Sequence, residues 1–168
     1  MSDERGVYER LCLEGFQSGL SWLTILRKRE AFRAAFAGFV PERVAGFGER
    51  DVERLLADAS IVRHRGKIEA AIANARATVA LRETGTSLHE LFWAHGPVAH
   101  RTPLSAADWV GSTPESAALA KTLKRAGFRF LGPTTVYAAQ QACGVVNDHL
   151  ASCWVRAIVE LERSHHFG

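Results

Sequence analysis

The feature that most constrains the fold is a short apolar turn between two helical stretches in the C-terminal third of the chain. Apolar residues recur at helical spacing over residues 116–124, and Gly127 follows, where glycine can take the left-handed conformation that ends a helix. After a short apolar run, Gly132 and Pro133 open a second helical stretch, because proline in the first turn of a helix sacrifices no hydrogen bond. The pattern predicts a helix, a tight hairpin and a second helix over about residues 116–143.

This hairpin has the features of a phosphate-binding site. Free N–H groups and the helix dipole attract an anion at a helix N-terminus, and a glycine there lets a DNA backbone come close. Four basic residues flank the turn, at Lys121, Lys124, Arg125 and Arg129. An ordinary helical hairpin with a solvated basic face explains the spacing equally well, so the pattern alone leaves both alternatives open.

The remainder of the chain is also helical in pattern, and strand-like alternation is absent from the sequence. The chain has 168 residues, of which 47% are hydrophobic, and this predicts one all-α domain over residues 1–168. Helices are expected over residues 7–39 with one interruption at 15–22, from 41, over 49–59, after the basic turn 61–68, over 88–93 and over 148–163.

Charge and targeting signals narrow the class of protein. The net charge of +3 suits an anionic partner without requiring one. No apolar run is long enough to span a bilayer and the first residues do not resemble a signal peptide, so a cytoplasmic protein without a membrane partner is expected. The three cysteines form no C-x-x-C motif, and a disulfide framework is not expected.

Two positions are candidates for chemistry on their residue types alone. Glu14 precedes the interruption at residues 15–22 and has apolar neighbours, which would desolvate its carboxyl group and raise its pKa; a plain surface glutamate is the alternative. His149 and Cys153 are four residues apart on the expected last helix and could bind zinc, but a tetrahedral structural site needs four ligands. A core cysteine beside a capping histidine is the alternative there, and His165 and His166 are either substitute ligands or a tag-like pair.

Four segments then occur in a characteristic order: CLEGFQSGLSW at 12–22, IVRHRGKI at 61–68, GFRFLGPT at 127–134 and VNDH at 146–149. Together they resemble the signature segments of the DNA-3-methyladenine glycosylase I family, within the helix-hairpin-helix glycosylases. The resemblance covers nearly the whole chain. It implies a helix-hairpin-helix helical bundle that excises 3-methyladenine from alkylated double-stranded DNA as a monomer, by base flipping and hydrolysis of the N-glycosidic bond.

The resemblance also implies roles for individual residues. Glu14 would be the catalytic carboxylate that accepts a hydrogen bond from the adenine amine, and Trp22 would stack on the flipped base. The base pocket would comprise Gln17, Trp22, Tyr137 and Asn147. The DNA contacts would be Gly19, Leu20, Arg63, Arg65, Lys67, Gly127, Arg129, Gly132 and Thr134, with Leu20 as a candidate wedge and a structural role as the alternative for Arg63, Arg65 and Lys67.

Two departures from the family pattern affect the expected chemistry. Thr134 and Thr135 stand where related lyases carry a lysine, which argues for simple hydrolysis, and Asn147 stands where many relatives carry an aspartate, with Asp148 beside it. Family members have a further N-terminal segment whose cysteine and histidine complete a zinc site with the residues matched to His149 and Cys153. Zinc is therefore a candidate structural cofactor expected to bind weakly or not at all. A truncated member that binds DNA without efficient excision is the alternative function, and a helical interaction domain without a nucleic-acid role is the third.

Overall fold

The computed structural model describes residues 3–97 and 99–167, and within these residues it contains helices and no strand. This confirms the predicted all-α class. The elements are α1 (Glu4–Gln17), α2 (Trp22–Arg27), α3 (Arg29–Ala35), the 3-10 helix η1 (Ala37–Phe39), α4 (Pro41–Ala45), α5 (Glu49–Ala57), α6 (Arg65–Glu83), α7 (Leu88–Ala94), η2 (Ala106–Asp108), α8 (Pro114–Arg125), α9 (Pro133–Cys143) and α10 (Val155–Phe167). None of the described helices is long and apolar enough to cross a membrane.

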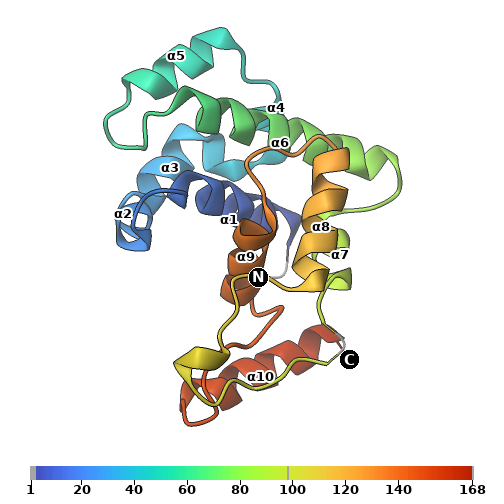
Figure 1. The fold of residues 1–168 in the computed structure, drawn as a ribbon. Coiled ribbons are helices and arrows are strands. Elements are labelled where there is room, and N and C mark those ends of the chain that lie inside the picture. The colour runs from blue at the N-terminus through green and yellow to red at the C-terminus, as the bar shows by residue number, and fades with distance from the viewer. Residues whose placement is uncertain (1–2, 98, 168) are drawn as a thin grey trace.

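Helix α1 is the central element, and it packs against α6, α7 and α9. Its buried side chains include Tyr8 and Phe16, which join an aromatic cluster with Phe32, Phe36 and Phe39. Figure 1 shows α5 and α6 on one side of this body and α10 on the opposite side, with long irregular segments leading to α10. The core thus fixes α1, which carries Glu14, as a rigid platform.

The predicted interruption after α1 is present, and Ser21 caps the helix that follows it. Ser21 Oγ accepts a hydrogen bond from the backbone N–H of Thr24 at 3.2 Å at the start of α2. Gly19 has φ +82°, a conformation that favours glycine, and it turns the chain at the loop tip. Lys67 of α6 donates through Nζ to the carbonyls of Phe16 at 2.9 Å and Ser18 at 2.5 Å, so α6 holds the end of α1 in place.

The hairpin between α8 and α9 is built as the glycines indicated. Gly127 has φ +96°, and its N–H donates to Lys124 O at 3.1 Å while that of Phe128 donates to Leu123 O at 3.0 Å. This pair of bonds is the Schellman arrangement that ends a helix. Asn74 of α6 then pairs with the backbone of Arg129, donating to its carbonyl at 3.2 Å and accepting from its N–H at 2.7 Å. The turn is therefore attached to α6 as well as to its own two helices.

Three expected boundaries were wrong. The last helix begins at Val155 instead of 148, because Arg156 NH1 donates to the carbonyls of Asn147 at 2.9 Å and His149 at 2.7 Å and holds this segment in an irregular path. The stretch 7–39 has further breaks after α2 and at η1, where Gly38 has φ +70°. The basic turn 61–68 is half helix, since α6 begins at Arg65 with His64 as its N-cap.

Candidate active site

Glu14 is buried on α1 and is the most perturbed carboxyl group of the site. Glu14 is 1% exposed, and its Oε1 has no hydrogen-bond partner among the described residues. Burial raises the pKa of Glu14 to about 7, against an opposing effect of the Arg10 charge. The desolvated environment inferred from its neighbours in the sequence is thus present, and the carboxyl group is poised to change charge near neutral pH.

Trp22 and Glu14 are brought together by Arg10, which sequence reasoning missed. The Arg10 guanidinium carbon lies 5.0 Å from the centroid of the Trp22 ring, and its NH1 lies 3.8 Å from Glu14 Oε1. Arg10 precedes Glu14 by four residues, so both point from the same face of α1. That spacing was the available signal in the sequence.

The end of α1 and the loop that follows it hold three further predicted residues. Gln17 Nε2 donates to Leu20 O at 2.6 Å, so this amide braces the loop. Leu20 is 38% exposed at the tip, as a wedge requires, and an added Cβ at Gly19 would meet nothing within 4 Å. The loop is therefore open to an approaching molecule on its outer side.

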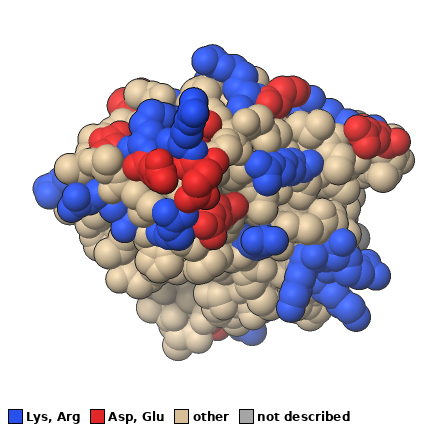
Figure 2. All heavy atoms as spheres, turned by 90° about the horizontal axis from the view of Figure 1, so that it is seen from above, with Lys and Arg blue, Asp and Glu red and all other residues tan. Residues whose placement is uncertain are grey.

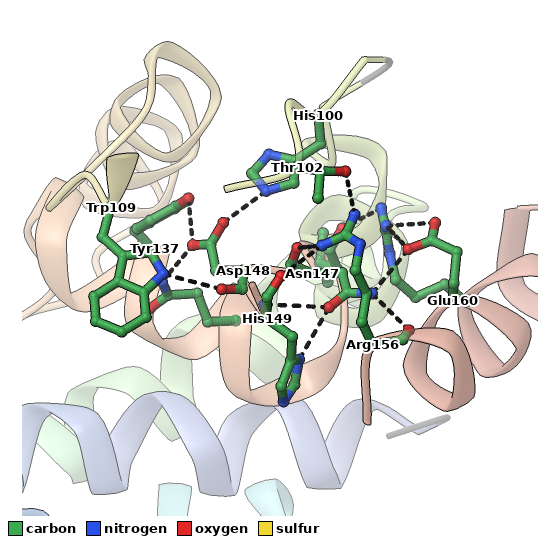
Figure 3. Close-up of polar contacts among 12 residues, drawn as sticks. His100, Thr102, Trp109, Tyr137, Asn147, Asp148, His149, Arg156 and Glu160 are labelled. Atoms are coloured by element: carbon green, nitrogen blue, oxygen red, sulfur yellow. Dashed lines mark hydrogen bonds and ion pairs between the residues drawn. The ribbon is translucent and has the colours of Figure 1, made fainter. Parts of the chain in front are cut away.

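Tyr137 belongs to a second polar group, centred on Asp148 (Figure 3). Tyr137 Oη donates to Asp148 Oδ2 at 2.7 Å, Gln141 also donates to this oxygen, and His100 Nε2 lies 2.6 Å from Oδ1. Burial acts to raise the pKa of Asp148, but the hydrogen bonds from these neighbours outweigh it and leave this pKa lowered. The pKa of Tyr137 is raised by burial and by Asp148. Asp148 is thus a charged acceptor that fixes the Tyr137 hydroxyl.

Asn147 is buried and its amide is occupied by α10 and by its own loop. Its Nδ2 donates to Glu160 Oε2 at 2.8 Å and to Arg156 O at 3.1 Å, and its Oδ1 lies 2.9 Å from His149 Nδ1 (Figure 3). The hydrogen bond from Asn147 lowers the pKa of Glu160. The geometry favours a structural role for Asn147 over a direct contact with a base.

The two predicted metal ligands lie near each other in the irregular segment before α10. His149 and Cys153 line a cavity of about 450 Å³ together with Trp109, Gln141, Val146, Asp148 and Leu150. Among the described side chains, which end at residue 164, no three of His, Cys, Asp or Glu are grouped so that they could hold a metal ion. The side chains of His165 and His166 lie outside the described part. The described residues therefore do not fit a complete four-ligand zinc site.

The predicted DNA contacts divide into exposed and engaged residues. The turn residues Gly132, Thr134 and Arg129 are exposed, and an added Cβ at Gly132 would meet nothing within 4 Å. Arg63 and Gly127 are exposed as well. Arg65, in contrast, pairs with Glu49 at 2.7 Å and Glu69 at 3.5 Å, and Lys67 is buried against carbonyls, so the geometry favours the structural alternative for Lys67.

Basic side chains gather unevenly on the face shown in Figure 2. Some of the Lys and Arg side chains stand next to acidic ones, whereas one large group has no acidic side chain against it. A cluster without neutralising neighbours attracts anions more strongly than an interspersed one.

The structure thus forms two groups, one with Glu14, Trp22 and Arg10 and the other with Tyr137 and Asp148. Arg10 and Glu14 lie on α1 and Tyr137 lies on α9, and these two helices pack directly against each other. Sequence reasoning missed His100 and the role of Asp148 as well as Arg10, and for His100 no local pattern pointed to a partner 48 residues away.

Comparisons with known proteins agree on one family. A family model described as methyladenine glycosylase matches residues 1–157. DNA-3-methyladenine glycosylase 1 of Escherichia coli is 48% identical over 156 residues, which cover 90% of this chain and 82% of that protein. A Haemophilus influenzae DNA-3-methyladenine glycosylase is 39% identical over 154 residues, covering 90% of this chain and 83% of that protein.

Solved structures give the same result. A crystal structure of 3-methyladenine DNA glycosylase I has a TM-score of 0.87 at 48% identity and covers 92% of this chain and 86% of that chain. A Staphylococcus aureus 3-methyladenine DNA glycosylase I, described in terms of 3-methyladenine recognition, has a TM-score of 0.88 at 34% identity, covering 93% of this chain and 84% of that chain. The match of the family model, the identity to curated relatives and the shared fold lead to one conclusion: this chain belongs to the methyladenine glycosylase family.

Proposed function

We propose that this chain is a base-excision repair enzyme that releases 3-methyladenine from alkylated DNA by hydrolysing the N-glycosidic bond. The observation that carries the proposal is the buried carboxyl group of Glu14, which lacks a hydrogen-bond partner at Oε1 and is linked to Trp22 through Arg10. Relatives named DNA-3-methyladenine glycosylase support the substrate.

Recognition of the base follows from these two side chains. A base inside a duplex is out of reach, so the nucleotide must be flipped out and read by stacking and by hydrogen bonds to its edge. Trp22 offers an aromatic face, and Glu14 Oε1 can accept a hydrogen bond from the exocyclic amine. An adenine methylated at N3 and still attached to its sugar is cationic, and an aromatic face and a carboxylate both attract a cation.

The chemical step can be simple because the leaving group is already activated. Water adds to the C1′ carbon of the sugar, the electron pair of the C1′–N9 bond passes to the base and neutralises it, and a water proton is released to solvent. The ionised carboxylate of Glu14 stabilises the cationic base, and the positive charge of the entering base lowers the pKa of Glu14. Thr134 and Thr135 offer no amine for a Schiff base, which supports hydrolysis without strand cleavage.

The α8–α9 hairpin is the proposed anchor for double-stranded DNA. The N-terminus of α9 presents backbone N–H groups after Gly132, where nothing lies within 4 Å of an added Cβ, so a phosphate has room to approach. Lys124 and Arg129 are exposed close to this site. We expect the protein to act on DNA as a monomer.

His149 and Cys153 are the described residues that would hold a structural zinc ion. The described residues contribute His149 and Cys153, which is half of a tetrahedral ligand set, so we propose that zinc binds this polypeptide weakly. Elemental analysis of the purified protein checks this, and one zinc ion per chain would contradict it.

The proposed function is tested by release of free 3-methyladenine from methylated duplex DNA. The wild-type chain should release the base, and the Glu14→Gln variant should do so far more slowly because it has no negative charge to stabilise the cation. Absence of release with salt-dependent DNA retention would favour the alternative function, binding without excision.

A further inference from the structure

Arg10 occupies the surroundings that the proposed mechanism assigns to the flipped base. Its guanidinium is a planar, delocalised cation that lies 5.0 Å from the Trp22 ring centroid and 3.8 Å from Glu14 Oε1. A base methylated at N3 is also planar and cationic, and it would seek the same aromatic face and the same carboxylate. The side chain therefore resembles the substrate in both shape and charge.

The contact that Arg10 makes with Glu14 is weak. A separation of 3.8 Å is too long for a hydrogen bond, and an arginine that precedes a glutamate by four residues has the less favourable order on a helix. Glu14 Oε1 and Arg10 Nε are both buried, and neither has a hydrogen-bond partner among the described residues. A buried polar atom without a hydrogen-bond partner destabilises the protein, and a ligand that donated a hydrogen bond to Glu14 Oε1 would remove this destabilisation.

The Arg10 side chain is more exposed to solvent than that of Glu14. Its side chain is 15% exposed, whereas that of Glu14 is 1% exposed, so Arg10 is the member of this pair that reaches solvent. On the inner side the site is bounded by α9. Burial raises the pKa of Cys143 on that helix to about 11, and the charges of both Arg10 and Glu14 also act on this thiol.

We infer that Arg10 occupies the base-binding slot between Trp22 and Glu14 in the free protein and swings out when the cationic base enters. This inference rests on the proposed function. Arg10 acts as an internal competitor, so the apparent affinity for a base is reduced by the fraction of molecules in which the slot is closed. No bond is made or broken, and Arg10 determines affinity without being a catalytic residue.

The first test is binding of a fixed cationic probe, 3,9-dimethyladeninium, which carries a methyl group where the nucleoside carries its sugar. Arg10→Met keeps the length of the side chain and removes its charge, and it should bind the probe about tenfold more tightly than wild type by calorimetry. Arg10→Lys keeps the charge without the planar group, so its affinity for the probe should lie between those of wild type and Arg10→Met. Equal or weaker binding by Arg10→Met, or no binding by either protein, would overturn the inference.

The second test observes Arg10 itself. The ring current of Trp22 should displace the Nε–H resonance of Arg10 in the NMR spectrum of the free protein, and saturation with the probe should return it to the position of an exposed arginine. A resonance that does not move on saturation would overturn the inference. If wild type releases no base but Arg10→Met binds the probe more tightly than wild type does, only the proposed function is wrong. If wild type releases the base but Arg10→Met does not bind the probe more tightly, only the role of Arg10 is refuted.

Discussion

Replacing Glu14 by glutamine should remove activity and yet stabilise the protein at alkaline pH. The pKa of the buried Glu14 carboxyl group is raised from 4.5 to about 7, mainly by burial, so the folded protein binds a proton that the unfolded chain has already lost. The stability that wild type has below pH 4.5 is therefore lost progressively as the pH rises towards about 7, and little changes above that. The variant has a neutral side chain at every pH and escapes this loss.

The size of the effect follows from the shift in pKa. At about 1.4 kcal/mol for each pH unit, the displacement from 4.5 to about 7 corresponds to about 3 kcal/mol. The difference in unfolding free energy, Glu14→Gln minus wild type, should grow by about this amount between pH 4.5 and pH 8.5.

Urea unfolding of both proteins across this pH range measures the difference directly, and titrations common to both proteins cancel. Glu53→Gln is the matched control, because Glu53 is exposed and its replacement removes the same charge from the surface. A difference between wild type and Glu14→Gln that stays constant with pH would show that Glu14 is not desolvated and would refute the reasoning.

Three further predictions concern catalysis and the α8–α9 hairpin, the proposed DNA anchor. The kcat/KM for base release by wild type, which reports the free protein, should increase with pH as Glu14 ionises through about 7, whereas that of the residual release by Glu14→Gln should not. Asn74→Ala removes both hydrogen bonds to the Arg129 backbone, so it should lower the unfolding free energy by about 1–3 kcal/mol and weaken DNA binding. Unchanged stability in urea would show that Asn74 does not hold the hairpin against α6. Arg129→Met should reduce by about one the slope of the logarithm of the DNA-binding constant against the logarithm of the salt concentration. Lys67→Met should lower the unfolding free energy and leave this slope unchanged, because two backbone carbonyls engage Lys67 Nζ. Equal slopes for the two variants would refute a DNA contact for Arg129 and a structural role for Lys67.

Local patterns predicted much of the fold because the helix ends depend on a few residues. Gly127 and Gly132 act over three or four residues of chain, and each stands at the helix end expected of it. The start of α10 could not be predicted in this way. It depends on Arg156 reaching back to the carbonyls of Asn147 and His149, contacts that belong to the tertiary structure.

The candidate site was predictable to the extent that its residues lie in contiguous segments. Glu14 stands among apolar neighbours in the sequence and is buried in the structure. The Tyr137–Asp148–His100 group joins segments 48 residues apart in sequence, and no local pattern links them. For Lys67 the basic run in the sequence left a DNA contact and a structural role open, and its hydrogen bond to the end of α1 favours the structural role.

The most direct test of the account is the release of free 3-methyladenine from methylated duplex DNA by this chain and by its Glu14→Gln variant. Because Glu14 is the buried carboxyl group that Arg10 links to Trp22, wild type should release the base and the variant should release it at least about a hundredfold more slowly, a cost of about 3 kcal/mol in transition-state stabilisation. Equal rates for the two proteins would contradict the central role of Glu14, and no release by wild type would contradict the proposed activity itself.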